Sequence, residues 1–142
     1  MDAYFNQLYV EKRLLNEYRK HNKLIIGLDF DDTIFDCHNK GHEFNDVIQL
    51  IKECNELDFH VVIFTASSPE RFLMMEEYCQ SIGIKINGIN RNYEGLPNGM
   101  GTAGKIYYNI LLDDRAGLYS SYIALREVVD QIKLERQNGN NS

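Results

Sequence analysis

Two aspartates stand two residues apart at the end of an apolar run near the start of the chain. Residues 24–28 are Leu-Ile-Ile-Gly-Leu, and an Asp-Phe-Asp-Asp-Thr motif follows at residues 29–33. Side chains alternate along extended backbone, so Asp29 and Asp31 are predicted to face one side while Phe30 faces the core. Two carboxylates this close are costly unless a cation neutralises them or one takes a proton. The pair therefore suggests a carboxylate nucleophile with a neighbouring acid/base around Mg²⁺, although a strand ending in a polar turn is the simpler alternative.

Helices and strands alternate along the chain, and they must position Asp29 and Asp31. Helices are predicted over residues 3–20, 45–57, 68–82 and 118–136, and strands over residues 24–29, 59–65, 84–89 and 107–112. Strands separated by helical segments of this length imply right-handed βαβ units and a parallel sheet. We therefore predict a doubly wound α/β fold in one domain over residues 1–137, followed by a disordered tail over residues 138–142.

Polar residues follow several of these strands. In open parallel sheets the ligand binds beyond the carboxyl ends of the strands, where the strand order reverses. A strand order of 3-2-1-4 brings together the residues that end strands one, two and four, namely Asp29, Asp31, Thr65, Asp113 and Asp114. Lys105 stands just before strand four and is expected to join them. The sequence therefore predicts one crevice with four carboxylates, a hydroxyl and a lysine.

This crevice suggests phosphoryl chemistry. Mg²⁺ suits the carboxylates, because it is a hard cation that takes oxygen ligands. Lys105 would hold a phosphate oxygen or the nucleophile. Thr65 would offer its hydroxyl to the same phosphate, with Ala66 and the free amides at the start of the next helix beside it. An aspartate can then attack phosphorus to give an aspartyl-phosphate, in a transfer that depends mostly on positioning and charge neutralisation.

Composition excludes several other classes of protein. The 142 residues include 15 basic and 21 acidic ones, for a net charge of −6. This balance disfavours non-specific binding to nucleic acid and to anionic membranes. The three cysteines, Cys37, Cys54 and Cys79, form no metal-binding pattern and favour a reduced intracellular protein. We find no signal peptide and no apolar stretch of the ~20 residues that span a bilayer, and predict a cytoplasmic protein.

Four parts of the sequence together resemble the haloacid dehalogenase superfamily of phosphohydrolases. The parts are residues 29–33, Val62-Ile63-Phe64-Thr65, Lys105, and Leu111-Leu112-Asp113-Asp114-Arg115. The resemblance implies a Rossmann-like three-layer fold and makes Asp29 the nucleophile. It makes Asp31 the residue that protonates the leaving group and then activates water, while its carbonyl binds Mg²⁺. It also implies that Thr65 and Lys105 bind phosphate, and that Asp113, Asp114 or both hold the metal.

The chain has no room for the cap domain that many members of this superfamily carry. The 31 residues between Thr33 and Thr65 are taken up by a helix, a strand and most of an irregular flap, which spans residues 33–44. The 39 residues between Thr65 and Lys105 are taken up by a helix, a strand and the Gly-rich loop over residues 90–104. We therefore expect a capless protein, whose exposed site could be closed by the flap, the loop or a second copy of the chain in a homo-oligomer.

The first functional hypothesis is a Mg²⁺-dependent phosphomonoester hydrolase acting on a small phosphorylated substrate, a nucleotide or sugar phosphate, with a phosphoprotein left open. A phosphorylatable receiver-type module is the second hypothesis, although in receivers the acidic pair closes the first strand, whereas here it comes last. A catalytically silent binding protein of the same fold is the third. His38, Lys40 and His42 of the flap could touch a substrate, but solvated loop residues are the simpler interpretation. We interpret Asp32 as a turn residue that points away from the site.

Overall fold

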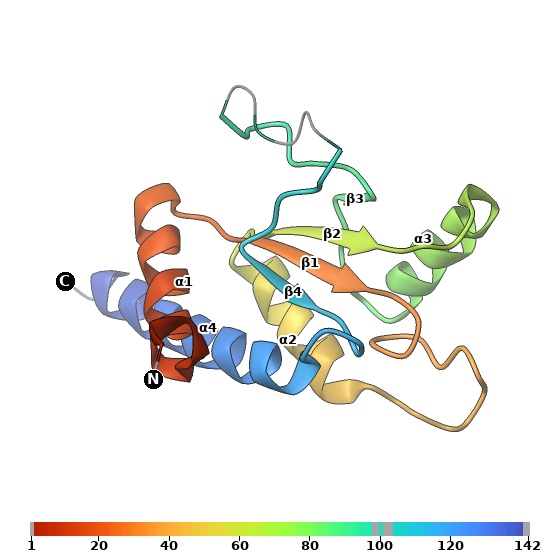
Figure 1. Cartoon of the computed structure of the whole chain (residues 1–142), viewed down its shortest axis with the longest axis horizontal. Helices are drawn as coiled ribbons and strands as arrows, with labels where there is room; N and C mark the ends of the chain where they lie inside the picture. The colour runs from red at the N-terminus through yellow and green to blue at the C-terminus, as the bar shows by residue number, and fades with distance from the viewer. Residues whose placement is uncertain (1, 98–99, 101–103, 141–142) are drawn as a thin grey trace.

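A parallel sheet of four strands forms the centre of the structure (Figure 1). The computed structural model describes residues 2–97, 100 and 104–140. The strands are β1 (Ile25–Asp29), β2 (His60–Phe64), β3 (Gly88–Ile89) and β4 (Ile110–Leu112). They lie in the order β3-β2-β1-β4, and all three neighbouring pairs are parallel. The predicted α/β class and the predicted strand order 3-2-1-4 are therefore confirmed.

The register of the sheet aligns the carboxyl ends of its central strands. Asp29, the last residue of β1, is level with Phe64, the last residue of β2. Leu28 is level with Leu112, the last residue of β4. Asp113 therefore follows β4 in the same row as Asp29, and Thr65 follows β2 one row further on. The polar residues that end three strands thus lie along one edge of the sheet.

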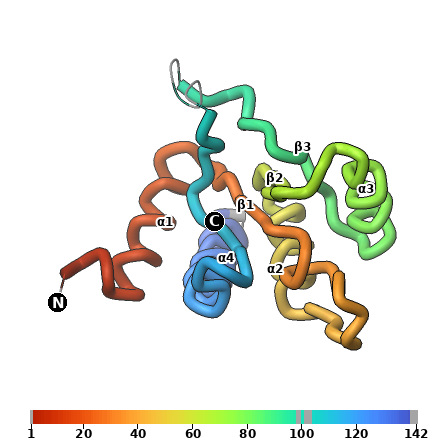
Figure 2. Tube along the Cα trace, turned by 45° about the vertical axis from the view of Figure 1, so that its right-hand side comes forward, coloured from red at the N-terminus to blue at the C-terminus, as the bar shows by residue number. Residues whose placement is uncertain are grey.

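One face of the sheet packs against the helices. These are α1 (Gln7–His21), α2 (Asn45–Glu56), α3 (Phe72–Ser81) and α4 (Leu118–Asn140). All four helices contribute to a single buried apolar cluster, together with alternate residues of the strands: Ile26, Leu28, Val61, Ile63, Ile110 and Leu112. Since side chains alternate along a strand, this set occupies one face of the sheet. Figure 2 shows α1 lying beside α4 within this helical layer.

The other face of the sheet is covered by the chain that leads into β4. Tyr108 lies on this face, with its ring 5.3 Å from that of Phe64. A Cβ atom at Gly27 would lie 3.0 Å from Leu111 and 3.4 Å from Tyr108, so glycine lets these side chains approach the sheet. No described helix lies there, because the crossover from β3 to β4 is irregular wherever the structure describes it. The expectation of a three-layer fold is therefore wrong for the described part of the chain.

Asparagine side chains shorten two of the predicted strands. The Val61 N–H donates to Asn87 Oδ1 at 2.8 Å, and the Ile25 N–H donates to Asn109 Oδ1 at 2.6 Å. In each case a side-chain oxygen takes the place of a ladder carbonyl at the amino end of a strand. The ladders of β3 and β4 therefore begin at Gly88 and Ile110 instead of residues 84 and 107.

Two predicted boundaries at the ends of the chain also differ. The first predicted helix is divided at Asn6, which ends the short helix η1 (Ala3–Phe5) and caps α1 by accepting the Leu8 N–H at 2.9 Å. Helix α4 continues through residues 138–140 because extending a formed helix costs little. The prediction of disorder is wrong for these residues, while residues 141–142 lie outside the described part. No helix in the described residues is long and apolar enough to span a membrane.

Candidate active site

A cavity of about 670 Å³ opens at the carboxyl edge of the sheet. Six of the seven predicted site residues line this cavity: Asp29, Asp31, Thr65, Ala66, Asp113 and Asp114. They come from the ends of β1, β2 and β4, which the parallel order and the register bring together. The structure therefore brings these six residues together without Lys105, and their chemical roles remain predictions.

Three carboxylates form the most acidic part of the cavity. One oxygen from each of Asp29, Asp113 and Asp114 lies within 4.8 Å of the others. Burial, a hydrogen bond with Asp114 and the charge of Asp113 raise the pKa of Asp29 from 3.8 to about 7. These are the expected consequences of desolvation and like charge. The oxygen-only donor set fits a hard divalent cation such as Mg²⁺, whose charge would offset the repulsion.

A buried threonine joins the turn after β1 to the end of β4. Thr33 is 0% exposed. Its hydroxyl lies 3.2 Å from Asp29 Oδ2 and 3.4 Å from Asp114 Oδ1, either of which can accept its hydrogen. The same oxygen accepts the Asp114 N–H at 3.1 Å. Thr33 therefore fixes two of the acidic residues relative to each other. Its place two residues after Asp31 in the motif is the sequence signal for this role, which was not predicted.

An arginine holds Asp31. Arg71 is the last residue of the short helix η2 (Pro69–Arg71), which precedes α3. Its Nη1 donates to Asp31 Oδ2 at 2.8 Å, and its Nη2 donates to Asp31 Oδ1 at 3.0 Å. Paired N–H groups of this kind fix the plane of a carboxylate as well as its position. Arg71 stands 40 residues from Asp31, and no sequence signal connects the two.

Hydrogen bonds to the backbone of Thr65 fix its position. Asn90, which follows β3, accepts the Thr65 N–H at 2.9 Å and donates to the Thr65 carbonyl at 2.8 Å. The Thr65 hydroxyl oxygen accepts the Ser67 N–H at 3.0 Å. Because this leaves the hydroxyl hydrogen available, Thr65 can donate into the cavity. Asn90 thus holds the end of β2 in place, a role that was not predicted from the sequence.

Lys105 lies apart from the other predicted site residues. It is exposed and does not line the cavity. Asn109 donates its N–H to the carbonyl of Ile25 at the amino end of β1, and Lys105 stands four residues before Asn109. The length of β1, roughly 13 Å for four residue steps, separates that end from Asp29. The structure therefore does not support Lys105 as a phosphate ligand, because a residue before a parallel strand lies at the edge opposite the site.

Asp32 does not point away from the site. It does occupy a turn, with a left-handed φ of 59°. Its side chain nevertheless lines the cavity together with those of Cys37 and His38. The turn after β1 folds back when the Asp32 N–H donates to the Phe35 carbonyl at 2.8 Å, which brings the flap over this rim of the cavity. Lys40 and His42 line a smaller hollow next to it, where they neighbour Asp32 and His38.

The raised pKa of Asp29 predicts how stability depends on pH without a divalent cation. The folded state holds the Asp29 proton more tightly than the unfolded state, so this group costs stability as the pH rises from about 4 to about 7. We expect Asp29→Asn to raise the Tm at pH 8 in EDTA. Since Asp29 keeps contact with solvent, the gain is of the order of 1–2 kcal/mol, or about 3–8 °C.

Calorimetry of both proteins at pH 5 and pH 8 tests this prediction. The difference in Tm should be larger at pH 8, and Mg²⁺ should reduce it by stabilising the wild type alone. A variant that is less stable than the wild type at pH 8 in EDTA would show that Asp29 is not repelled by its neighbours.

Comparisons with known proteins support the fold and assign no family. No known family model and no curated protein matches the chain. A solved structure of a conserved protein coded by a locus from Bacteroides thetaiotaomicron is similar, with a TM-score of 0.60 and 20% sequence identity. The likeness covers 78% of this chain and 92% of the other. It agrees with the parallel strand order in showing a Rossmann-like α/β fold.

Proposed function

We propose that the protein is a Mg²⁺-dependent phosphomonoester hydrolase of the haloacid dehalogenase type. The observation that carries the proposal is the convergence of Asp29 and Asp31 with Asp113 and Asp114 in one cavity. Asp29, the proposed nucleophile, is followed two residues later by a second carboxylate, Asp31, and an acidic pair follows the neighbouring strand β4. That combination supports transfer through an aspartyl-phosphate better than the receiver-type alternative, in which the acidic pair closes the first strand.

The reaction consists of two displacements at phosphorus. A carboxylate oxygen of Asp29 attacks the substrate phosphorus, and the bond to the leaving oxygen breaks while Asp31 donates a proton to that oxygen. Asp31 then removes a proton from water, and the water oxygen attacks the same phosphorus. This step releases inorganic phosphate and restores the carboxylate of Asp29. Thr65 donates its hydroxyl hydrogen to a phosphate oxygen in both steps.

The acidic residues would hold the cation. The carboxylates of Asp29, Asp113 and Asp114 and the carbonyl of Asp31 would bind Mg²⁺, which supplies charge neutralisation for the nucleophile and the phosphoryl oxygens. Thr33 keeps Asp29 and Asp114 in register for this purpose through its hydroxyl contacts. The nucleophile must be ionised, and a bound cation favours that form against the repulsion of its neighbours.

The substrate is proposed to be a small phosphorylated metabolite, a nucleotide or a sugar phosphate. The segments on either side of β2 are occupied by α2 and α3, so no cap domain covers the cavity in the described residues. The cavity opens to solvent beside the exposed Arg115, a cation that can meet the polar part of a substrate. A second copy of the chain could close the site, and the cytoplasm is the proposed location.

Hydrolysis of an aryl phosphate with and without Mg²⁺ tests the proposed function. We expect turnover with Mg²⁺ and loss of turnover in EDTA, restored when Mg²⁺ is added back. Formation of a covalent phosphoryl adduct can be followed by intact mass on a rapid time scale. Absence of both turnover and adduct with aryl phosphate, nucleotides and sugar phosphates would favour the silent binding protein.

Variants of two positively charged residues, Arg71 and Lys105, test which of them positions Asp31. We expect Arg71→Met to lower kcat roughly ten-fold with little change in KM, because Asp31 loses its fixed orientation. Arg71→Lys should restore little, since lysine cannot bind a carboxylate through two parallel N–H groups. Lys105→Met is the matched control. It should change kcat and KM less than about three-fold, because substitutions of exposed residues away from the cavity usually have small effects.

Steady-state kinetics with one aryl phosphate distinguishes these variants. A large loss in Lys105→Met with normal activity in Arg71→Met would mean that Lys105 reaches the site during turnover and that Arg71 does not position the acid.

A further inference from the structure

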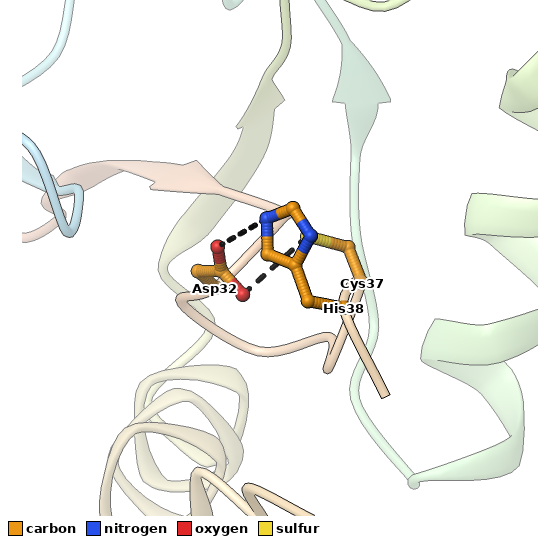
Figure 3. A group of neighbouring side chains, drawn as sticks. All are labelled: Asp32, Cys37 and His38. Atoms are coloured by element: carbon orange, nitrogen blue, oxygen red, sulfur yellow. Dashed lines mark hydrogen bonds and ion pairs between the residues drawn. The ribbon is translucent and has the colours of Figure 1, made fainter. Parts of the chain in front are cut away.

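Asp32, Cys37 and His38 form a group of neighbouring side chains at the rim of the cavity. The Cys37 Sγ lies 3.4 Å from Asp32 Oδ1, and the His38 Nε2 lies 3.5 Å from Asp32 Oδ2. Donor atoms from all three residues lie within 4.8 Å of one another. Figure 3 shows the histidine ring and the thiol on the same side of the Asp32 carboxylate. The acidic trio of Asp29, Asp113 and Asp114 contributes no atom to this group.

These separations are close to the distances between neighbouring ligand atoms in a tetrahedral zinc site. Zinc binds cysteine sulfur at about 2.3 Å and histidine nitrogen or carboxylate oxygen at about 2.0–2.2 Å. A tetrahedron with these bond lengths has sulfur–oxygen and nitrogen–oxygen edges of roughly 3.4–3.6 Å. The observed contacts of 3.4 and 3.5 Å have these lengths, but they reach different oxygens of Asp32, so a cation bound to one carboxylate oxygen requires this carboxylate to turn. The donor atoms already lie within 4.8 Å of one another, so only the side chains need to move.

The backbone of the flap holds these donors close together before any cation binds. Phe35 accepts the Asp32 N–H at 2.8 Å and the Cys37 N–H at 2.9 Å, so one carbonyl fixes the chain at both residues. Asp36 accepts the N–H groups of Lys40 and Gly41 at 3.1 and 2.7 Å and closes the rest of the loop. Preorganisation of this kind lowers the entropic cost of binding.

The donor types separate this group from the acidic trio. A thiolate and an imidazole select zinc and related transition metals, whereas the carboxylates of Asp29, Asp113 and Asp114 suit Mg²⁺. Asp32, Cys37 and His38 all line the cavity, so a fourth coordination position would open into it. Three protein ligands with one open position are typical of zinc sites that also bind water or another ligand.

We propose that Asp32, Cys37 and His38 bind Zn²⁺ or a similar transition-metal ion at the rim of the cavity, with one coordination position open to the cavity. The bound ion holds the flap to the turn after β1. The inference does not rest on the proposed phosphatase activity, because it concerns different donors and a different class of cation. The three cysteines form no metal pattern in the sequence, and only the turn at Asp32 brings Cys37 to a partner.

Cobalt substitution tests the proposal through the spectrum of the bound ion. The full chain, reduced and in excess Mg²⁺, is titrated with Co²⁺ and then with Zn²⁺. We expect one Co²⁺ per chain, a thiolate-to-cobalt charge-transfer band in the near ultraviolet, and loss of the band when Zn²⁺ displaces Co²⁺. Cys37→Ser should remove the band, and His38→Ala should weaken binding at least ten-fold.

Two control variants test whether the cobalt signal comes from Asp32, Cys37 and His38 and not from another histidine or from the acidic trio. His21→Ala removes an exposed histidine at the end of α1 and should leave binding unchanged. Asp113→Asn should keep the charge-transfer band, since Asp113 belongs to the acidic trio. The side chain of His38 is 65% exposed, so His38→Ala is expected to fold, and a thermal melt of each variant checks this.

Three results would overturn the proposal. They are the absence of stoichiometric Co²⁺ binding, a charge-transfer band that survives in Cys37→Ser, and a band that disappears in Asp113→Asn but persists in His38→Ala. Protection of Cys37 from alkylation by Zn²⁺, with the buried Cys54 and Cys79 as internal references in the same mass spectrum, is an independent expected result.

Discussion

Replacement of Asp29 by Asn is expected to abolish Mg²⁺-dependent hydrolysis, with a fall in kcat of roughly 10⁴-fold or more, as for other lost nucleophiles. The amide cannot attack phosphorus. Asp29 is the carboxylate that ends β1 beside Asp113 and within 4.8 Å of oxygens of both Asp113 and Asp114. Initial rates of aryl phosphate hydrolysis and the covalent adduct detected by intact mass both measure the effect. Neither signal should rise above background in the variant.

A matched aspartate separates this effect from a general change in charge. Asp58 is exposed, away from the cavity, in the left-handed conformation that asparagine also accepts. Asp58→Asn should therefore retain full activity. Asp29→Asn is expected to be more stable than the wild type at pH 8 in EDTA, and a thermal melt in the Mg²⁺ assay buffer checks that the variant is also folded where its activity is measured. Wild-type activity in Asp29→Asn would remove Asp29 from the role of nucleophile.

Replacement of Asp31 by Asn carries the second large expected effect. We expect kcat to fall by about 10²–10⁴-fold, the usual contribution of a general acid–base residue. The loss should be greater for alkyl phosphates than for nitrophenyl phosphate, because a poor leaving group needs a proton more. The variant should also accumulate phosphorylated Asp29 with nitrophenyl phosphate, since Asp31 is the proposed base for the second step.

A comparison of leaving groups checks this assignment. Equal losses for alkyl and aryl phosphates, without accumulation of the covalent adduct, would show that Asp31 acts in binding instead of proton transfer. The Arg71 variants provide a graded version of the same test, because they disturb the position of Asp31 without removing its carboxyl group.

Several parts of the site follow from local rules and could be predicted. The alternation of side chains along a strand and the common edge of parallel strands bring Asp29 and Asp113 together once the strand order is known. The same rules do not favour phosphate binding by Lys105, since a residue that precedes a parallel strand lies at the amino edge of the sheet, opposite the cavity. Lys105 stands close to β4 in sequence, but it is exposed and does not line the cavity at the carboxyl edge.

Other features depend on contacts between distant segments. The pairing of Arg71 with Asp31 joins residues 40 positions apart, and the pairing of Thr33 with Asp114 joins residues 81 positions apart. No periodic pattern encodes such pairs, because each depends on where whole helices and strands settle against the sheet. The covering of the second sheet face by Tyr108 is of the same kind, since an irregular crossover leaves no helical periodicity to detect.

The amino-acid sequence was sufficient for the α/β class and for Asp29, Asp31, Asp113 and Asp114, because strands alternating with helices imply a parallel sheet and side chains alternate along a strand. The strand order 3-2-1-4 was predicted as the one that brings the polar strand ends together with a single reversal. The partners of those residues required the folded chain. Asp32 illustrates the difference: the sequence predicts a turn, but its left-handed backbone directs the carboxylate toward Cys37 and His38. Side-chain direction at a turn depends on dihedral angles and long-range packing, which residue type and spacing do not specify.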